Sequence, residues 1–86
     1  MATLIAFHDV DDVDHWLASP RREQLFGPIG TTVRTFVDPD KKNRTGLIME
    51  VSDMAKFEAL MASEEGAEAM KLDGVRADTL VMLVEA

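Results

Sequence analysis

The chain has 86 residues, no cysteine, and 16 acidic against 9 basic side chains, which gives a formal net charge of −7. A chain of this length forms one domain spanning residues 1–86, because domains usually need about 50 to 200 residues. Without cysteine it holds neither a disulfide nor a thiolate metal site, and its two histidines leave little for structural zinc. The acidic charge repels phosphate and anionic lipid, so we expect neither nucleic acid nor a membrane as a partner.

The N-terminal segment carries an apolar run without a basic region before it. This run is too short for a secretion signal or a membrane span, and we therefore expect a cytoplasmic protein. Residues 3–10 (TLIAFHDV) instead favour a strand that ends where the acidic residues begin.

The first helix is predicted directly after this strand. Asp11 or Asp12 caps it, and acidic residues in its first turn suit the positive end of the helix dipole. Its apolar positions follow spacings of three and four, at Val13, Trp16 and Leu17. Pro20 ends it, because proline cannot continue a hydrogen-bonded helical turn, and a second short helix follows through Phe26.

The middle of the chain predicts an antiparallel hairpin. Residues 31–38 and 45–51 are rich in β-branched and apolar side chains, and the polar turn 39–44 separates them. Ser52 or Asp53 then caps a third helix, whose apolar face holds Met54, Phe57, Leu60 and Met61.

The last segments complete the pattern. Ser63 restarts the helix for a continuation through Leu72, and Gly74 terminates it. Residues 77–86 predict the fourth strand. The order βαββαβ is that of the ferredoxin-like α+β fold with a four-stranded antiparallel sheet.

The predicted strands do not alternate between apolar and polar side chains. Residues 4–7, 47–49 and 80–84 are continuous apolar runs, so both faces of the sheet must be covered. The chain has enough helix for one face. A second copy of the chain is the favoured cover, because homo-oligomers are common, although a larger ligand or another protein would also serve.

Polar residues within apolar strands are the candidate chemical groups. His8, with an ordinary pKa near 6.5, would act as an acid or base, or else lie partly exposed at a strand end. Arg34 would hold an anionic substrate group or pair with Glu50 on the neighbouring strand. Glu50 would serve as a general base only with a raised pKa. Strand parity groups His8 and Arg34 with Phe36, Met49 and Met82, and groups Glu50 with Ile5, Phe7, Val33, Val37, Ile48, Val81 and Leu83.

Other residues have a structural and a functional interpretation. Trp16 continues the apolar stripe of its helix, so core packing is favoured over a cavity wall; the expected walls of a pocket are Trp16, Phe36, Met49 and Met82. Arg21 and Arg22 oppose the dipole at the start of a helix, and a solvated surface is favoured over attraction of an anion. The acids and histidines of residues 8–15 match no ligand motif, so no metal is expected.

Three stretches resemble the dimeric α/β-barrel superfamily, which includes antibiotic-biosynthesis monooxygenases and small ferredoxin-like dimers of unknown function. They are HDVDDVDHW (8–16), TFVDPDKKNRTGLIMEVSDMAKFEALMAS (35–63) and EAMKLDGV (68–75). The resemblance implies two sheets facing each other across a dimer, with a ligand cavity between sheet and helices. It also implies relatives that are cofactor-free oxygenases, haem-degrading enzymes, isomerases or cyclases. The haem branch resembles an Asn–His–Trp set, which is not matched here, since Asn43 lies in a turn and no histidine follows residue 15; no cofactor is expected.

Three functions follow from these observations. The first is a small homodimer of unknown role that binds a small apolar or weakly anionic molecule between its sheet and helices. The second is a cofactor-independent oxygenase, isomerase or cyclase for an aromatic or polyketide-like substrate, in which His8 moves a proton and Arg34 holds an oxyanion. The third is a dimeric interaction module without catalysis. Whether the protein is an enzyme stays open at this stage.

Overall fold

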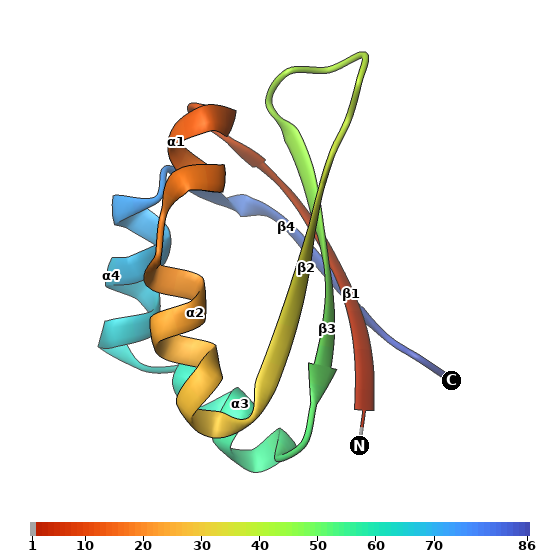
Figure 1. The fold of residues 1–86 in the computed structure, drawn as a ribbon, viewed down its shortest axis with the longest axis vertical. Coiled ribbons are helices and arrows are strands. Elements are labelled where there is room, and N and C mark those ends of the chain that lie inside the picture. Colours follow the sequence, from red (N-terminus) through yellow and green to blue (C-terminus); the bar gives the residue numbers. More distant parts are fainter. Residues whose placement is uncertain (1) are drawn as a thin grey trace.

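The computed structural model describes residues 2–86, and within them the chain forms a four-stranded antiparallel sheet with its helices packed on one side (Figure 1). The predicted ferredoxin-like α+β fold is confirmed. The elements in chain order are β1 (Ala2–Val10), α1 (Val13–Ala18), α2 (Arg21–Phe26), a 3₁₀ turn (Gly27–Ile29), β2 (Thr31–Val37), β3 (Arg44–Val51), α3 (Met54–Met61), α4 (Glu64–Leu72) and β4 (Val75–Val84).

The helices begin where short polar side chains satisfy free backbone N–H groups. The Asp12 carboxylate accepts from the backbone N–H of His15 at 3.1 Å, and Asp53 accepts from that of Lys56 at 3.1 Å. The Ser63 hydroxyl caps α4 in the same way. The predicted caps are therefore confirmed, with Asp12 and Asp53 chosen from the two alternatives at each place.

The sheet has the order β2-β3-β1-β4, and alternate side chains divide between its two faces. The face under the helices forms the core, with buried Leu4, Ala6 and Val10 on β1 and Leu47, Met49 and Val51 on β3. Trp16 of α1 and Phe57 of α3 close this core from the helix side.

The outer face of the sheet has no helix over it within residues 2–86 (Figure 1). Four large apolar side chains are 42–55% exposed there, from β1, β2 and β4: Ile5, Phe36, Val81 and Leu83. We call this surface the open face. A sheet that meets water on one side normally carries polar residues on that side. The open face carries apolar residues instead, as the continuous apolar runs of the sequence predicted.

The side-chain parity predicted for β2 is wrong. Val33 pairs with Met49 and Val37 with Thr45, which places both valines on the helix side. Arg34 and Phe36 consequently point to the open face. The register is fixed by the connecting turn and by pairing with β3, and neither can be read from the alternation within β2 itself.

The pairing of β1 with β4 is interrupted beside His8. Phe7 pairs with Val81, but Asp9 pairs with Arg76, so β4 has extra residues between these points. The Asp9 N–H donates to the Thr79 hydroxyl at 2.8 Å across the interruption. A β-bulge of this kind bends the strand and re-aims side chains. Here it frees the β1 edge at His8 from the regular ladder with β4.

Gly66, in the first turn of α4, lies where α3 and α4 pack closely, and a substitution there tests this packing. A Cβ at this position would collide with the backbone carbonyl oxygen of Leu60, whereas a Cβ at Gly27 would meet nothing within 4 Å. We expect Gly66→Ala to lower the free energy of unfolding by about 1–3 kcal/mol, as overpacking does. Gly27→Ala, the control, should leave it unchanged or slightly raised. Urea denaturation at one protein concentration measures both, and an unchanged Gly66→Ala variant would contradict the packing described.

Candidate functional site

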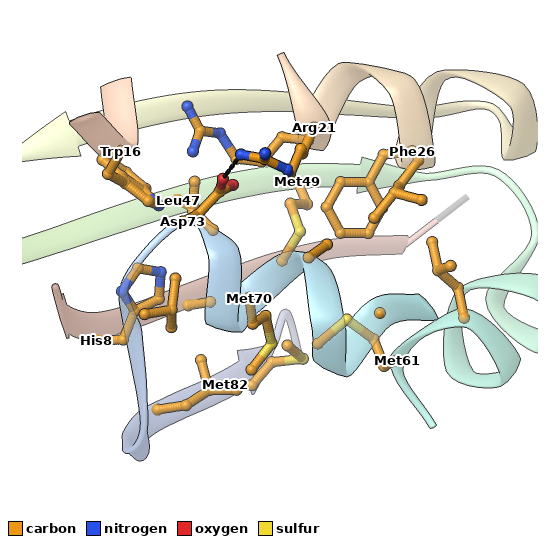
Figure 2. A pocket seen from close by; sticks show the side chains of 18 residues that line it. His8, Trp16, Arg21, Phe26, Leu47, Met49, Met61, Met70, Asp73 and Met82 are labelled. Carbon is orange, nitrogen blue, oxygen red and sulfur yellow. Dashed lines mark hydrogen bonds and ion pairs between the residues drawn. The ribbon is translucent and has the colours of Figure 1, made fainter. Parts of the chain in front are cut away.

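A cavity of about 70 Å³ lies between the helices and the covered face of the sheet (Figure 2). Figure 2 shows His8 and Trp16 toward one end and Phe26 and Met61 toward the other. Most of its lining is apolar and comes from β1, β3, β4 and all the helices: Ala6, Trp16, Leu25, Phe26, Leu47, Met49, Leu60, Met61, Gly66, Ala69, Met70, Val75, Leu80 and Met82, with His8, Arg21, Arg22 and Asp73 as the polar members.

His8 brings an imidazole to the cavity from β1. It is 5% exposed, its ring meets Trp16 edge-on at 5.5 Å between centroids, and its Nδ1 lies 3.1 Å from the Thr45 hydroxyl. That hydroxyl also donates to the His8 carbonyl oxygen at 3.0 Å. With its hydrogen used there, it accepts from Nδ1–H, which leaves Nε2 as the acceptor of the neutral ring.

Burial lowers the pKa of His8 from its ordinary value of 6.5. A hydrogen bond with the backbone of Asp9 acts in the opposite direction, and the nearby positive charge of Arg22 lowers the pKa further. His8 is therefore neutral near pH 7, a state in which the imidazole can accept a proton.

Arg22 enters the same end of the cavity from α2. Its guanidinium carbon lies 4.3 Å from the centre of the Trp16 ring, within the range of a cation–π contact. Its Nη1 is buried and has no hydrogen-bond partner within residues 2–86. Burial lowers the pKa of Arg22, while the charge of Asp73 raises it. The group stays cationic because an arginine pKa starts far above neutral.

The neighbouring Arg21 is already paired. Its Nη1 lies 2.8 Å from Oδ1 of the buried Asp73, and the Ser19 hydroxyl donates to the same oxygen at 2.6 Å. This network ties the start of α2 to the end of α4. It also uses the carboxylate that lines the cavity.

The predicted site residues separate onto the two faces of the sheet. His8 and three of the four residues expected as pocket walls, Trp16, Met49 and Met82, line the cavity. Arg34, Glu50 and Phe36 lie on the open face instead. Phe36 is thus not a wall of this cavity, and Arg34 cannot act beside His8 within one chain, because the sheet lies between them. Arg34 and Phe36 lie on the open face because of the register in which β2 pairs with β3.

The alternative of an Arg34–Glu50 ion pair is also replaced by other contacts. The Arg34 guanidinium lies over the Phe36 ring at 5.8 Å, and Glu50 accepts from the Thr3 hydroxyl at 2.9 Å. The cations at the cavity are instead Arg21, which is paired with Asp73, and Arg22; a solvated surface was favoured for both. The signal in the sequence was their unfavourable place at a helix start, which indicates a partner elsewhere in the fold.

A second, more open hollow of about 360 Å³ lies where β4 bulges away from β1. His8 borders this hollow as well as the cavity under the helices. The rest of its border comes from the open face and the hairpin turn: Phe7, Asp9, Lys41, Asn43, Arg44, Thr79 and Val81.

No three of the described histidine, aspartate and glutamate side chains gather as a set of metal ligands. No helix in the described part of the chain is long and apolar enough to cross a membrane.

The architecture belongs to the class of ferredoxin-like α+β proteins. The chain is similar to a solved antibiotic biosynthesis monooxygenase, with 18% identity and a TM-score of 0.67 over 100% of this chain and 97% of that one. It is similar to a dimeric ferredoxin-like protein of unknown function from Jannaschia sp. CCS1, with 15% identity and a TM-score of 0.64 over 98% of each chain. It is also similar to an ethyl tert-butyl ether D family protein from Bacillus halodurans C-125, with 18% identity and a TM-score of 0.58 over 100% of this chain and 97% of that one.

These likenesses confirm the predicted resemblance at the level of the fold. No protein-family model matches the sequence, and no curated protein matches it.

Burial of neutral His8 makes the stability of the fold depend on pH. The unfolded chain takes up a proton at His8 near 6.5, but the folded chain does so only at a lower pH. Below this pKa the unfolded state binds more protons than the folded state. The free energy of unfolding should therefore decrease as the pH is lowered from about 7.5 to 5.5, by at most about 1.4 kcal/mol per pH unit. Chemical denaturation across this range measures it.

His8→Gln should remove most of this pH dependence, and the matched variant His15→Gln on α1 should retain it. A slope that persists unchanged in His8→Gln would show that another group causes it.

Proposed function

We propose that this protein is a homodimer that binds a small apolar or weakly anionic molecule in the cavity between its sheet and helices. The observation that carries the proposal is the cavity itself, which combines a largely apolar lining with a polar end formed by His8 and Arg22. Binding sites for small molecules usually have this composition, with a few polar groups that fix orientation.

The size and the lining of the cavity limit the ligand. The cavity has a volume of about 70 Å³. Ligands of drug size occupy about 300–1,000 Å³. Met49, Met61, Met70 and Met82 surround the space, and their unbranched side chains adapt readily to a guest. The ligand is therefore smaller than a drug-sized molecule.

The second function, a cofactor-independent enzyme, is favoured by one observation. His8 is neutral, buried and close enough to Arg22 for that cation to lower its pKa. A base beside a fixed positive charge can remove a proton and leave the resulting anion stabilised. In this reading Arg22 takes the role first assigned to Arg34.

The homodimer is supported by the open face. Its exposed apolar side chains come from three strands. Full burial of a Leu, Ile, Val or Phe side chain contributes about 1.5–3 kcal/mol, and since these are 42–55% exposed in the single chain, covering each contributes roughly half of that. One of the similar structures is itself a dimeric ferredoxin-like protein. A two-fold axis would bring the same apolar patch of each subunit together and cover both.

Ligand entry can be tested with xenon, which needs no knowledge of the natural ligand. Under xenon pressure, NMR of ¹³C-methyl methionine should show shifts at Met49, Met61, Met70 and Met82, while Met54 outside the cavity serves as internal control. Ala69→Leu should fill the space and abolish these shifts. Ala59→Leu, an exposed substitution on α3, should preserve them. Unperturbed cavity methyl groups in the wild-type protein would refute the binding proposal.

The dimer can be tested by light scattering at micromolar concentration. The wild-type protein should have the mass of two chains, and Leu83→Glu should have the mass of one, because a carboxylate would be buried against an apolar surface. Leu72→Glu is the matched control, since Leu72 on α4 is 48% exposed and Leu83 is 55% exposed. A dimer that survives Leu83→Glu, or a wild-type monomer, would contradict the proposal.

A further inference from the structure

We propose that Arg22 anchors the anionic end of the bound molecule, and that the ligand is therefore a short-chain monocarboxylate. This inference rests on the proposed function and names its ligand class. It is carried by three observations: the charge of the cavity lining, the unpaired donor of Arg22, and the limited volume beside it.

The charged side chains that line the cavity have a net charge of one positive unit. Among the described residues around the cavity, the charged side chains are Arg21, Arg22 and Asp73, and His8 is neutral. Asp73 is held directly by Arg21 and Ser19. The charge of Arg22 is thus left without a contacting anion, although the chain as a whole is strongly acidic. A ligand with a single negative charge would complete the balance.

The Arg22 side chain is held in place for such a contact. Its guanidinium group packs on the face of Trp16, and Trp16 is 1% exposed. Nη1 is buried without an acceptor, which is costly for a charged donor and rare unless water or a ligand supplies one. The planar fork of a guanidinium group matches the two oxygens of a carboxylate.

The rest of the cavity limits what is attached to the carboxylate. Apart from Trp16 and the four polar residues His8, Arg21, Arg22 and Asp73, the lining consists of methionine, leucine, alanine, valine, phenylalanine and glycine residues. Because the volume of about 70 Å³ is well below that of a site for a drug-sized ligand, the apolar tail attached to the carboxylate should be short, as in butyrate. Larger anions and those with polar tails do not match this lining.

His8 reports on the occupant without depending on turnover. The charge of Arg22 lowers the pKa of His8, and Asp9 raises it. A bound carboxylate would cancel the field of Arg22, so the pKa of His8 should rise when the acid binds. His15, the other histidine of the sequence, is exposed, does not line the cavity and hydrogen-bonds the Leu72 carbonyl oxygen at the end of α4, so it provides an internal control.

The experiment compares butyrate with butyramide, which has nearly the same shape and no charge. NMR titration of the methionine methyl and histidine ring signals in the wild-type protein should give tighter binding of butyrate by about tenfold or more, as expected for a charge-assisted contact. The pKa of His8 should rise with butyrate alone. Arg22→Met keeps an apolar stem on Trp16 and should remove the preference for butyrate, and Arg22→Lys should restore part of it. Arg34→Met on the open face is the matched control and should retain the preference.

The outcomes separate the two proposals. Equal affinity for the two probes, an unchanged preference in Arg22→Met, or shifts with xenon but with neither probe would overturn the carboxylate anchor and leave the cavity proposal standing. If xenon also fails to enter, the cavity proposal fails with it. Should Arg22→Met not fold, the comparison of the two probes in the wild-type protein and the pKa of His8 still decide the question.

Discussion

A β-sheet presents side chains on both faces, and in the described part of this chain all the helices lie against the same one. The covered face makes the core and the cavity, and the open face keeps apolar side chains in contact with solvent in the single chain. A domain of this size buries a modest share of its surface and has a small net free energy of unfolding. The free energy that would be gained by covering the apolar open face is therefore large compared with that net stability. The single layer of helices therefore accounts both for a cavity within one subunit and for the proposed pairing of subunits.

Trp16 organises the polar end of the cavity. Its ring lies nearly perpendicular to that of His8 and carries the guanidinium group of Arg22 over its face. Perpendicular aromatic pairs and cations over an aromatic face are both favourable arrangements. The result is a buried neutral base and a partly buried cation close together at one end of the cavity. Electrostatic interactions at such sites are stronger than at a fully solvated surface.

The bulge in β4 gives His8 a further property. Regular pairing with β4 would enclose the end of β1, but the ladder breaks between Phe7 and Asp9, and the Thr79 side chain takes over one bond. His8 consequently borders both the cavity and the hollow at the rim of the open face. Bulges are common next to functional sites because they redirect side chains without breaking the sheet.

Part of the candidate site could be read from the sequence. His8 was identified because a titratable residue within an apolar strand is uncommon, and Trp16 because it continues a helical stripe; Met49 and Met82 followed from strand parity. Arg34 and Phe36 were misplaced because a shift of one residue in the register of β2 exchanges the faces of the sheet. Arg22 was missed as a cavity residue, since its contacts with Trp16 and the cavity depend on how α2 packs against α1 and the sheet.

The sequence by itself determined the elements, their order and their boundaries to within a few residues, because caps, prolines, glycines and apolar spacing act over a few neighbouring positions. It also determined that both faces of the sheet would be apolar. Tertiary structure alone decided which polar groups meet: it paired Asp73 with Arg21 and left Arg22 unpaired beside His8. Those contacts join residues up to 52 positions apart, and their geometry depends on strand register and helix packing, which local sequence does not encode.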